Sequence, residues 1–273
     1  MEILNIIILI SITISGTVFG SFFTLAVHRI PKGEDITHER SYCPKCNHKL
    51  QFLDLIPVWS YIFLGGKCRY CKEKIRPRYL ILEIFSGFTF LLFAIMHNIN
   101  IDSNIKDYIN FGINVLFLCA MYIIAGIDKE KKIIPNSLIV YGLIISIFRI
   151  FYNYIYNINI GLNLCGFLII PSFLFLINII TKNILKISKE PFGYGDIKYL
   201  AILGLYFGFG TQIVGLFISA IISFFGVIIE LIKKKDEMIF GFYLSIGFII
   251  LMIFEPKIQD FIQICNSMLE FNI

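Results

Sequence analysis

Long apolar segments, separated by short basic ones, are the main feature of the chain. Each is long enough to cross the roughly 30 Å hydrocarbon core of a bilayer as a helix that rises about 1.5 Å per residue. The segment between Lys198 and Lys233 contains a single charged residue, Glu230, and is about twice the minimum length of one span. We expect it to divide near residues 208–212 into two short helices. This gives about eight transmembrane helices, with the other windows at 3–27, 79–97, 109–127, 137–157, 158–181 and 238–254.

The composition is typical of a membrane protein. The 273 residues are 57% hydrophobic and 16% charged, with a mean hydropathy of +0.79, which lies outside the range of soluble domains. Window 3–27 lacks a basic first region and a small-residue cleavage site, so we predict a retained span and not a signal peptide. The net charge of +5 could suggest a nucleic-acid partner. Because the basic residues lie between apolar segments, topology explains them, and we predict no nucleic-acid binding.

The distribution of basic residues predicts the orientation of the chain. Of the 24 Lys and Arg residues, 21 fall in segments that alternate spans place on one face of the membrane. Basic residues accumulate on the cytosolic face, so we expect these segments on the cytosolic side of the membrane and the N-terminus on the other side. The segments are 28–78, 128–136, 182–198 and 233–237.

Four of the seven cysteines form two pairs, Cys43 with Cys46 and Cys68 with Cys71, and 21 residues separate the pairs. Two residues between cysteines allow both thiolates of a turn to reach one ion, and two such pairs complete a tetrahedral Zn²⁺ site. A reducing cytosol keeps thiols available for metal, and a module of about 50 residues with few large apolar side chains needs metal ligation for stability. We predict a structural zinc site. The alternative is two redox-active cysteine pairs.

Two aspartates lie at the membrane edge. Asp128 ends the third predicted span and Asp196 begins the sixth, so both reach the inner face. Two carboxyls a few ångströms apart cannot both ionise easily, and such a pair can act as general acid and general base on a water molecule that attacks an amide. Gly193 and Gly195 leave room beside Asp196 for an extended peptide backbone. The alternative is that both aspartates only terminate helices at the interface.

Glu83 is a further charged residue inside an apolar segment, one turn into the second predicted span. Charged side chains at this depth are costly and therefore indicate either function or a specific partner. We expect Glu83 to face the zinc module or a polar cavity.

Short motifs recur in order along nearly the whole chain, at 20–23, 28–31, 41–46, 54–60, 68–71, 76–79, 128–135 and 193–198. Together they resemble the motifs of the bacterial type IV prepilin peptidases, which are membrane aspartic proteases of the GxGD type that also N-methylate their product. Two positions depart from the family pattern. Tyr194 stands in the middle of the usual triple glycine, and Asn136 replaces the usual acidic residue after Pro135.

The resemblance implies that Asp128 and Asp196 are the protease pair. It also implies that the region 20–83, which contains the four cysteines, takes part in methyl transfer from S-adenosylmethionine. No glycine-rich cofactor loop is visible in the sequence, so the methyltransferase activity rests on the resemblance. Four further residues are supporting candidates: Gly193, Gly195, Lys198 and Glu83.

We therefore expect an all-α polytopic membrane protein with a first span at 1–30, a cytosolic zinc module at 31–78, a helical bundle with the protease site at 79–254 and a C-terminal tail at 255–273. The expected function is cleavage of leader peptides from type IV prepilin or pseudopilin precursors at the cytosolic face of the bacterial inner membrane, followed by N-methylation. The alternatives are a peptidase without methyltransferase activity, a proton-coupled transporter and a non-enzymatic scaffold. A transporter would need polar groups at mid-membrane depth, and a scaffold leaves the paired aspartates unexplained.

Overall fold

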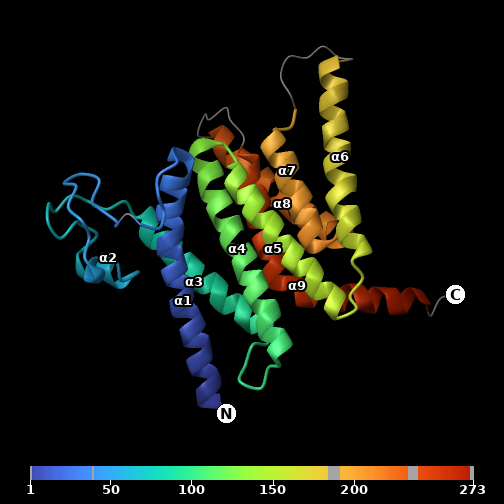
Figure 1. Ribbon diagram of the computed structural model, residues 1–273, viewed down its shortest axis with the longest axis horizontal. Helices are drawn as coiled ribbons and strands as arrows, with labels where there is room; N and C mark the ends of the chain where they lie inside the picture. The colour runs from blue at the N-terminus through green and yellow to red at the C-terminus, as the bar shows by residue number, and fades with distance from the viewer. Residues whose placement is uncertain (1, 39, 184–190, 233–238, 271–273) are drawn as a thin grey trace. The chain divides into compact units, whose positions relative to one another are not determined.

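The computed structural model describes residues 2–38, 40–183, 191–232 and 239–270, and in this part of the chain the regular elements are helices (Figure 1). Seven of the described helices are long and apolar enough to cross a membrane, namely α1, α3, α4, α5, α6, α8 and α9. The predicted all-α multi-pass fold is thereby confirmed. The elements are α1 (Glu2–Arg29), η1 (Ile30–Lys32), η2 (Phe52–Asp54), α2 (Trp59–Phe63), α3 (Arg78–Met96), α4 (Ile105–Lys131), α5 (Asn136–Ile155), α6 (Gly161–Asn183), α7 (Tyr194–Phe207), α8 (Phe209–Ile232) and α9 (Phe240–Glu270).

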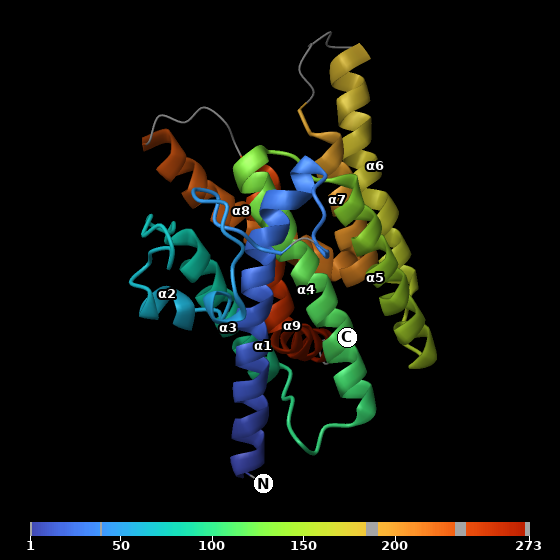
Figure 2. The same ribbon diagram turned by 60° about the vertical axis from the view of Figure 1, so that its left-hand side comes forward.

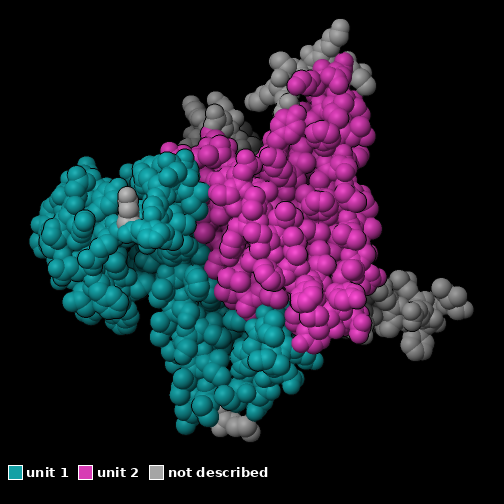
Figure 3. Space-filling view, viewed as in Figure 1, with its two compact units in different colours: residues 1–111, 252–273 teal, residues 112–251 magenta. Residues whose placement is uncertain are grey.

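The chain forms two compact units (Figure 3). Unit 1 comprises residues 1–111 and 252–273, and unit 2 comprises residues 112–251. The four cysteines therefore belong to unit 1, whereas Asp128 and Asp196 belong to unit 2.

In unit 1, small residues bring α1 and α3 close together, and the two helices lie side by side in both ribbon views (Figures 1 and 2). A Cβ atom at Gly20 would lie 2.8 Å from the Cα atom of Glu83. Ser86 Oγ donates a hydrogen bond of 2.6 Å to the carbonyl of Gly16. Small residues allow this approach between helices in a membrane, where apolar packing alone supplies little attraction. The segment with the cysteines therefore connects two helices that pack against each other.

In unit 2, the expected division of the long apolar segment occurs at Gly208, between α7 and α8. Gln212 Nε2 donates a hydrogen bond of 2.9 Å to the carbonyl of Leu200, so the start of α8 is fixed against α7. With 14 residues, α7 is shorter than the roughly 17 residues needed to span a bilayer. It packs against α5 and α6 and is almost fully buried from Ile197 onward.

Candidate active site and metal centre

Asp128 and Asp196 line the same cavity in unit 2. Asp128 lies in the last turn of α4 and is buried, and Asp196 lies in the first turn of α7. The cavity has a volume of about 270 Å³ and is lined by Asp128, Lys132, Ile133, Ile134, Gly193, Gly195 and Asp196. Two carboxyls in one cavity can share a proton and hold a water molecule between them.

The carboxyl group of Asp128 is held by the start of α9. Its Oδ2 atom accepts a hydrogen bond of 2.8 Å from the backbone N–H of Phe242. A Cβ atom at Gly241 would lie 3.0 Å from both Cγ and Oδ2 of Asp128, so only a glycine leaves the carboxyl in place without a shift. The ammonium group of Lys129 lies 4.6 Å from the centre of the Phe242 ring, which further ties the end of α4 to α9. Neither Gly241 nor Phe242 was predicted from the sequence, because a backbone donor and a missing side chain leave no motif there.

Asp196 is positioned by the loop before α7. Gly193 is the N-cap residue, with φ −65° and ψ 139°, and Asp196 follows in the first turn, where a carboxylate is favoured by the helix dipole. A Cβ atom at Gly193 would lie 3.0 Å from Asp196 Oδ2. Asn178 on α6 holds this loop through two hydrogen bonds to the backbone of Phe192. Its side-chain amide donates one of 2.8 Å to the carbonyl of Phe192 and accepts one of 3.2 Å from the N–H of Phe192. No sequence signal had indicated Asn178.

A second contact fixes the helices that carry the site. The hydroxyl groups of Tyr199 on α7 and Ser245 on α9 lie 3.0 Å apart, and both are buried. Tyr199 comes three residues after Asp196, and Ser245 comes four residues after Gly241. A hydrogen bond about one turn from the cavity therefore joins α7, which carries Asp196, to α9, whose backbone binds the Asp128 carboxyl.

The supporting residues from the sequence analysis fall in different places. Gly193 and Gly195 line the cavity. Lys198 lies outside its lining and donates a hydrogen bond of 3.1 Å to Asn136 Oδ1, so these two sequence positions do meet in the structure. Lys132, which the sequence analysis did not single out, brings a positive charge to the cavity lining.

Glu83 belongs to unit 1 and faces the cysteine module, which is one of the two expected placements. Its Oε2 atom accepts a hydrogen bond of 2.7 Å from the backbone N–H of Val58, directly before α2. Val58 has φ 63° and ψ −53°, an uncommon conformation for a β-branched residue. The buried carboxyl of Glu83 thus holds a strained turn at the start of α2.

The four cysteines of the module form one cluster. The sulfur atoms of Cys43, Cys46, Cys68 and Cys71 all lie within 4.8 Å of one another. The Sγ atoms of Cys43 and Cys71 are 3.9 Å apart, close to the about 3.8 Å edge of a tetrahedron with Zn–S bonds of about 2.3 Å. Burial opposes ionisation of Cys43, but hydrogen bonds from the backbone N–H groups of Cys46 and Lys45 lower its pKa to about 7. The donor set therefore fits zinc.

Both cysteine pairs use the same backbone turn. The N–H of Cys43 donates to His48 and its carbonyl accepts from Asn47. Cys68 makes the corresponding two hydrogen bonds with Glu73 and Lys72. Asn47 and Lys72 occupy the same place in the two turns and have φ values of 56° and 60°. Two equivalent turns that face each other present four sulfur atoms to one point, as a structural zinc site requires.

Asp54 ties the 3-10 turn η2 to the second cysteine pair. Its carboxylate accepts hydrogen bonds of 2.6 Å from Arg69 Nε and 3.1 Å from the hydroxyl of Tyr70, and its side chain is 3% exposed. Burial would raise the pKa of Asp54, but the hydrogen bonds from Arg69, Gln51 and Tyr70 lower it on balance, so the residue stays ionised at neutral pH. The ring of Tyr70 also lies against His48, with 3.6 Å between ring centres. The module is thus held by polar contacts around its sulfur cluster.

Fold and site together indicate a multi-pass membrane protein with a paired-aspartate cavity and a four-cysteine cluster that fits a metal ion. Two family models match the chain: the bacterial peptidase A24 N-terminal domain at residues 14–97, and the type IV leader peptidase family at residues 115–229. The chain belongs to this family, the bacterial type IV prepilin peptidases, as the sequence motifs had predicted.

Curated relatives agree with this family, and each is a prepilin leader peptidase/N-methyltransferase. The relative from Klebsiella pneumoniae is 28% identical over 71% of this chain and 83% of its own length. The relative from Vibrio cholerae is 29% identical over 79% of this chain and 84% of its own. The relative from Pseudomonas aeruginosa is 26% identical over 91% of both chains. Among solved structures, none is significantly similar to this chain.

Proposed function

We propose that this protein is a prepilin leader peptidase that uses Asp128 and Asp196 as an aspartic protease pair and N-methylates the new N-terminus. The observation that carries the peptidase proposal is the shared cavity of about 270 Å³, in which two carboxyls from helices far apart in the sequence lie together. Family membership and the names of the relatives support the same activity.

In the proposed reaction, the two carboxyls share one proton. The ionised carboxyl takes a proton from a water molecule, the water oxygen attacks the scissile carbonyl, and the protonated carboxyl donates to the carbonyl oxygen. The N–H of Phe242 occupies one oxygen of Asp128, which leaves the other oxygen for the water or the substrate. Gly193 and Gly195 leave the cavity wall without side chains where the peptide backbone approaches.

The proposed substrates are type IV prepilin or pseudopilin precursors. The positive-inside pattern supports a cytosolic location for the cysteine module and for the ends of α4 and α7. The apolar helix of a precursor would remain in the bilayer and bring its leader junction to the membrane edge. Confinement to the membrane plane would then supply much of the positioning that the reaction needs.

We propose Zn²⁺ as the resident metal and S-adenosylmethionine as the methyl donor. Cys43, Cys46, Cys68 and Cys71 would hold the zinc and stabilise the module. The cavity within the module is lined by Lys67, Lys74 and Arg76 and by no acidic residue. This lining does not suit the positively charged sulfonium group of S-adenosylmethionine, so we assign no residues to the binding of the methyl donor.

Two amide substitutions test the peptidase proposal. Asp128→Asn and Asp196→Asn should each lower leader cleavage by roughly 10²- to 10⁴-fold, because an amide can neither accept nor share the proton. Glu130→Gln is the matched control, since it makes the same chemical change at the exposed end of α4, outside the cavity lining. Precursor processing is followed by gel mobility shift with membrane levels held equal. Near-normal processing by either aspartate variant would refute the assignment.

A further inference from the structure

The cysteine module has an exposed apolar face. The turn η2 and the short helix α2 contact each other and expose large apolar side chains at adjacent positions. Phe52 and Phe63 are 79% exposed, and the indole ring of Trp59 stacks on Phe63 with 5.8 Å between ring centres while remaining 62% exposed. Exposed apolar side chains gathered in this way indicate an interaction surface. The face consists of Phe52, Leu53, Trp59, Ile62 and Phe63.

The helical part of this apolar face begins at the level of the first turns of the span α3. Val58, the residue before α2, donates its N–H to Glu83, which lies five residues inside α3. Five residues of helix correspond to about 7.5 Å, and the side chain of Glu83 leans back toward Arg78, where α3 begins. Val58 is thereby fixed within the first two turns of α3. The first turns of a span are expected near the boundary between headgroups and acyl chains, where aromatic side chains are favoured.

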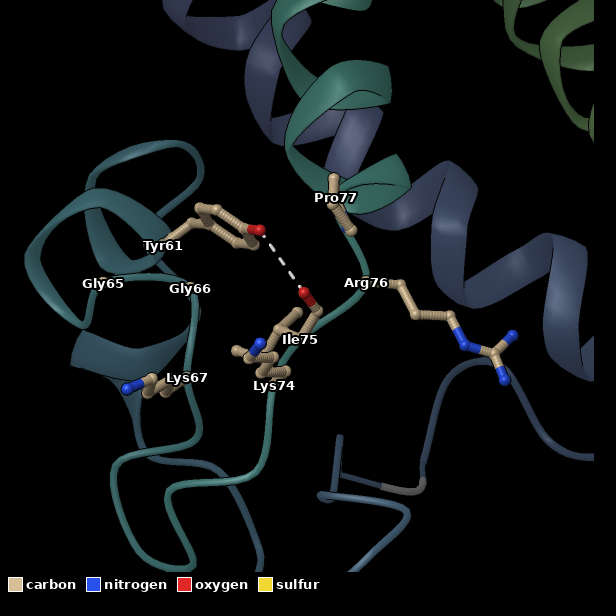
Figure 4. Close-up of a pocket in the computed structure, with 8 residues that line it drawn as sticks. All are labelled: Tyr61, Gly65, Gly66, Lys67, Lys74, Ile75, Arg76 and Pro77. Carbon is tan, nitrogen blue, oxygen red and sulfur yellow. Dashed lines mark hydrogen bonds between the residues drawn. The ribbon is translucent and has the colours of Figure 1, made fainter.

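Basic residues flank a cavity beside the same helix. The cavity has a volume of about 380 Å³, lies between α2 and the segment that leads into α3, and is spanned by a hydrogen bond of 3.3 Å from the Tyr61 hydroxyl to the carbonyl of Ile75 (Figure 4). Lys67, Lys74 and Arg76 line it, and no acidic residue does. Figure 4 shows Lys67 and Arg76 extending to opposite sides. Their charges therefore suit a surface of separate phosphates better than one small anion.

We propose that the cysteine module is an interfacial membrane anchor. The face on η2 and α2 inserts at the boundary between headgroups and acyl chains, and Lys67, Lys74 and Arg76 contact the phosphates of anionic phospholipids. An apolar face with aromatic residues and flanking lysines and arginines is the composition of segments that lie in this plane. Because α1 and α3 tether the module at both ends, the bilayer is always within reach. The anchoring does not depend on the proposed peptidase mechanism.

The single tryptophan of the chain makes the anchoring directly measurable, since Trp59 alone supplies the indole fluorescence. The full-length protein is reconstituted in phosphatidylcholine–phosphatidylglycerol vesicles with bromine atoms either near the headgroup end or near the methyl end of the acyl chains. We expect a blue-shifted emission that bromines near the headgroup end quench more strongly than bromines near the methyl end. We also expect poor quenching by aqueous acrylamide. The Trp59→Phe protein should show no such signal and supplies the background.

Two sets of variants separate the apolar and the charged contributions. Ile62→Asn/Phe63→Asn should shift the Trp59 emission to longer wavelength and reduce quenching by brominated lipid, with the zinc content unchanged. Lys67→Gln/Lys74→Gln/Arg76→Gln should abolish the increase in quenching that phosphatidylglycerol produces over phosphatidylcholine alone. The matched control Lys32→Gln/Arg40→Gln/Lys49→Gln removes the same charge from exposed positions of the module outside the cavity and should retain that increase.

Three results would overturn the proposal. If Trp59 shows the emission of a water-exposed indole, with strong acrylamide quenching and no effect of bromine, the face is solvated. Protection that appears only when a prepilin is added would make the face a substrate-docking surface. Protection that disappears when the protein is diluted to one copy per vesicle would make it a contact between copies of the chain.

Discussion

Asp128 accepts a hydrogen bond from the backbone N–H of Phe242 on α9, and the neighbouring Gly241 lies against the same carboxyl. The close approach of Gly241 sets where the Asp128 side chain can lie. At the other aspartate, Gly193 takes the corresponding role, because a Cβ atom there would press on Asp196. The absence of a side chain at these two glycines therefore leaves room for the two carboxyls.

We predict that Gly241→Ala lowers leader cleavage by roughly 10-fold, because a displacement of about 1 Å can cost about 10²-fold and the shift required here is smaller. The new methyl group would meet Asp128 at 3.0 Å and the Ile134 side chain at 3.2 Å, so the carboxyl has to move. Gly112→Ala, in the same helix as Asp128, is the control because a Cβ atom there meets nothing within 4 Å. Cleavage rates are measured on purified variants. Equal rates for the two variants would show that Asp128 tolerates displacement.

Asp54 is ionised, buried and bound to the second cysteine pair through Arg69 and Tyr70. Asp54→Asn should therefore release zinc severalfold faster to a chromophoric chelator, because an amide cannot accept both hydrogen bonds as a carboxylate does. Asp35→Asn is the control, since Asp35 bonds within its own loop, to Thr37 and His38. Unchanged release from the Asp54 variant would mean that the sulfur ligands alone hold the module.

The sequence predicted some of these residues and not others, for a physical reason. The four cysteines and two aspartates carry their chemistry in side chains at recognisable spacings, so their grouping could be expected. Gly241, Phe242 and Asn178 act through a missing side chain, a backbone donor and an amide among apolar residues. Phe242 is 114 positions from Asp128, and only the folded chain reveals such a pairing.

At the scale of elements, the boundary between α7 and α8 rests on one glycine. Gly208 has φ 80° and ψ 159°, a region that is essentially restricted to glycine. The length of the surrounding apolar segment predicted two helices with a break near this position. The charge pattern supported the division, because one span would have reversed the placement of the following lysines. The length of α7 could not be predicted in the same way. Its 14 residues suffice because α5 and α6 cover it.

We predict that Gly208→Ala destabilises the protein by about 1–3 kcal/mol, the usual cost of a strained backbone conformation. Gly210→Ala, two residues later in the first turn of α8, should be neutral or slightly stabilising, since a Cβ atom there meets nothing within 4 Å. Thermal unfolding in detergent and accumulation in membranes compare the two variants. A Gly208 variant as stable as the Gly210 variant would show that the turn relaxes without strain.

The last helix extends further than the apolar pattern indicates. The predicted span ends at residue 254, where Pro256 would be expected to stop a helix, yet α9 continues to Glu270. A proline at 256 leaves the carbonyl of residue 252 without its usual helical donor. His97 Nε2 lies 3.1 Å from that carbonyl, on Met252, and can replace the missing donor. A partner far away in sequence thus compensates for the proline, which no local pattern could indicate.

At the scale of the whole molecule, the two candidate centres belong to different compact units. The cysteine cluster and Glu83 lie in unit 1, and the two aspartates with their supporting glycines lie in unit 2. The two family models divide the chain in a similar way, with one model over 14–97 and the other over 115–229. We expect the proposed methyl transfer to depend on unit 1 and the proposed hydrolysis on unit 2.

Removing the metal tests this division of labour. We predict that Cys43→Ser/Cys68→Ser, which removes one ligand from each turn, loses its zinc and yields pilin that is cleaved but largely unmethylated. The reason is that the metal stabilises a module with little apolar core, whereas the residues that line the aspartate cavity, and the Phe242 N–H that holds Asp128, all belong to the other unit. Cys119→Ser is the control, since Cys119 lies outside the cluster. This variant should keep one zinc per chain. Metal analysis and mass spectrometry of the pilin N-terminus give both readouts. Uncleaved precursor at normal protein abundance would show instead that the module supports both activities, because its loss would then have spread to the helices that carry Asp128 and Asp196.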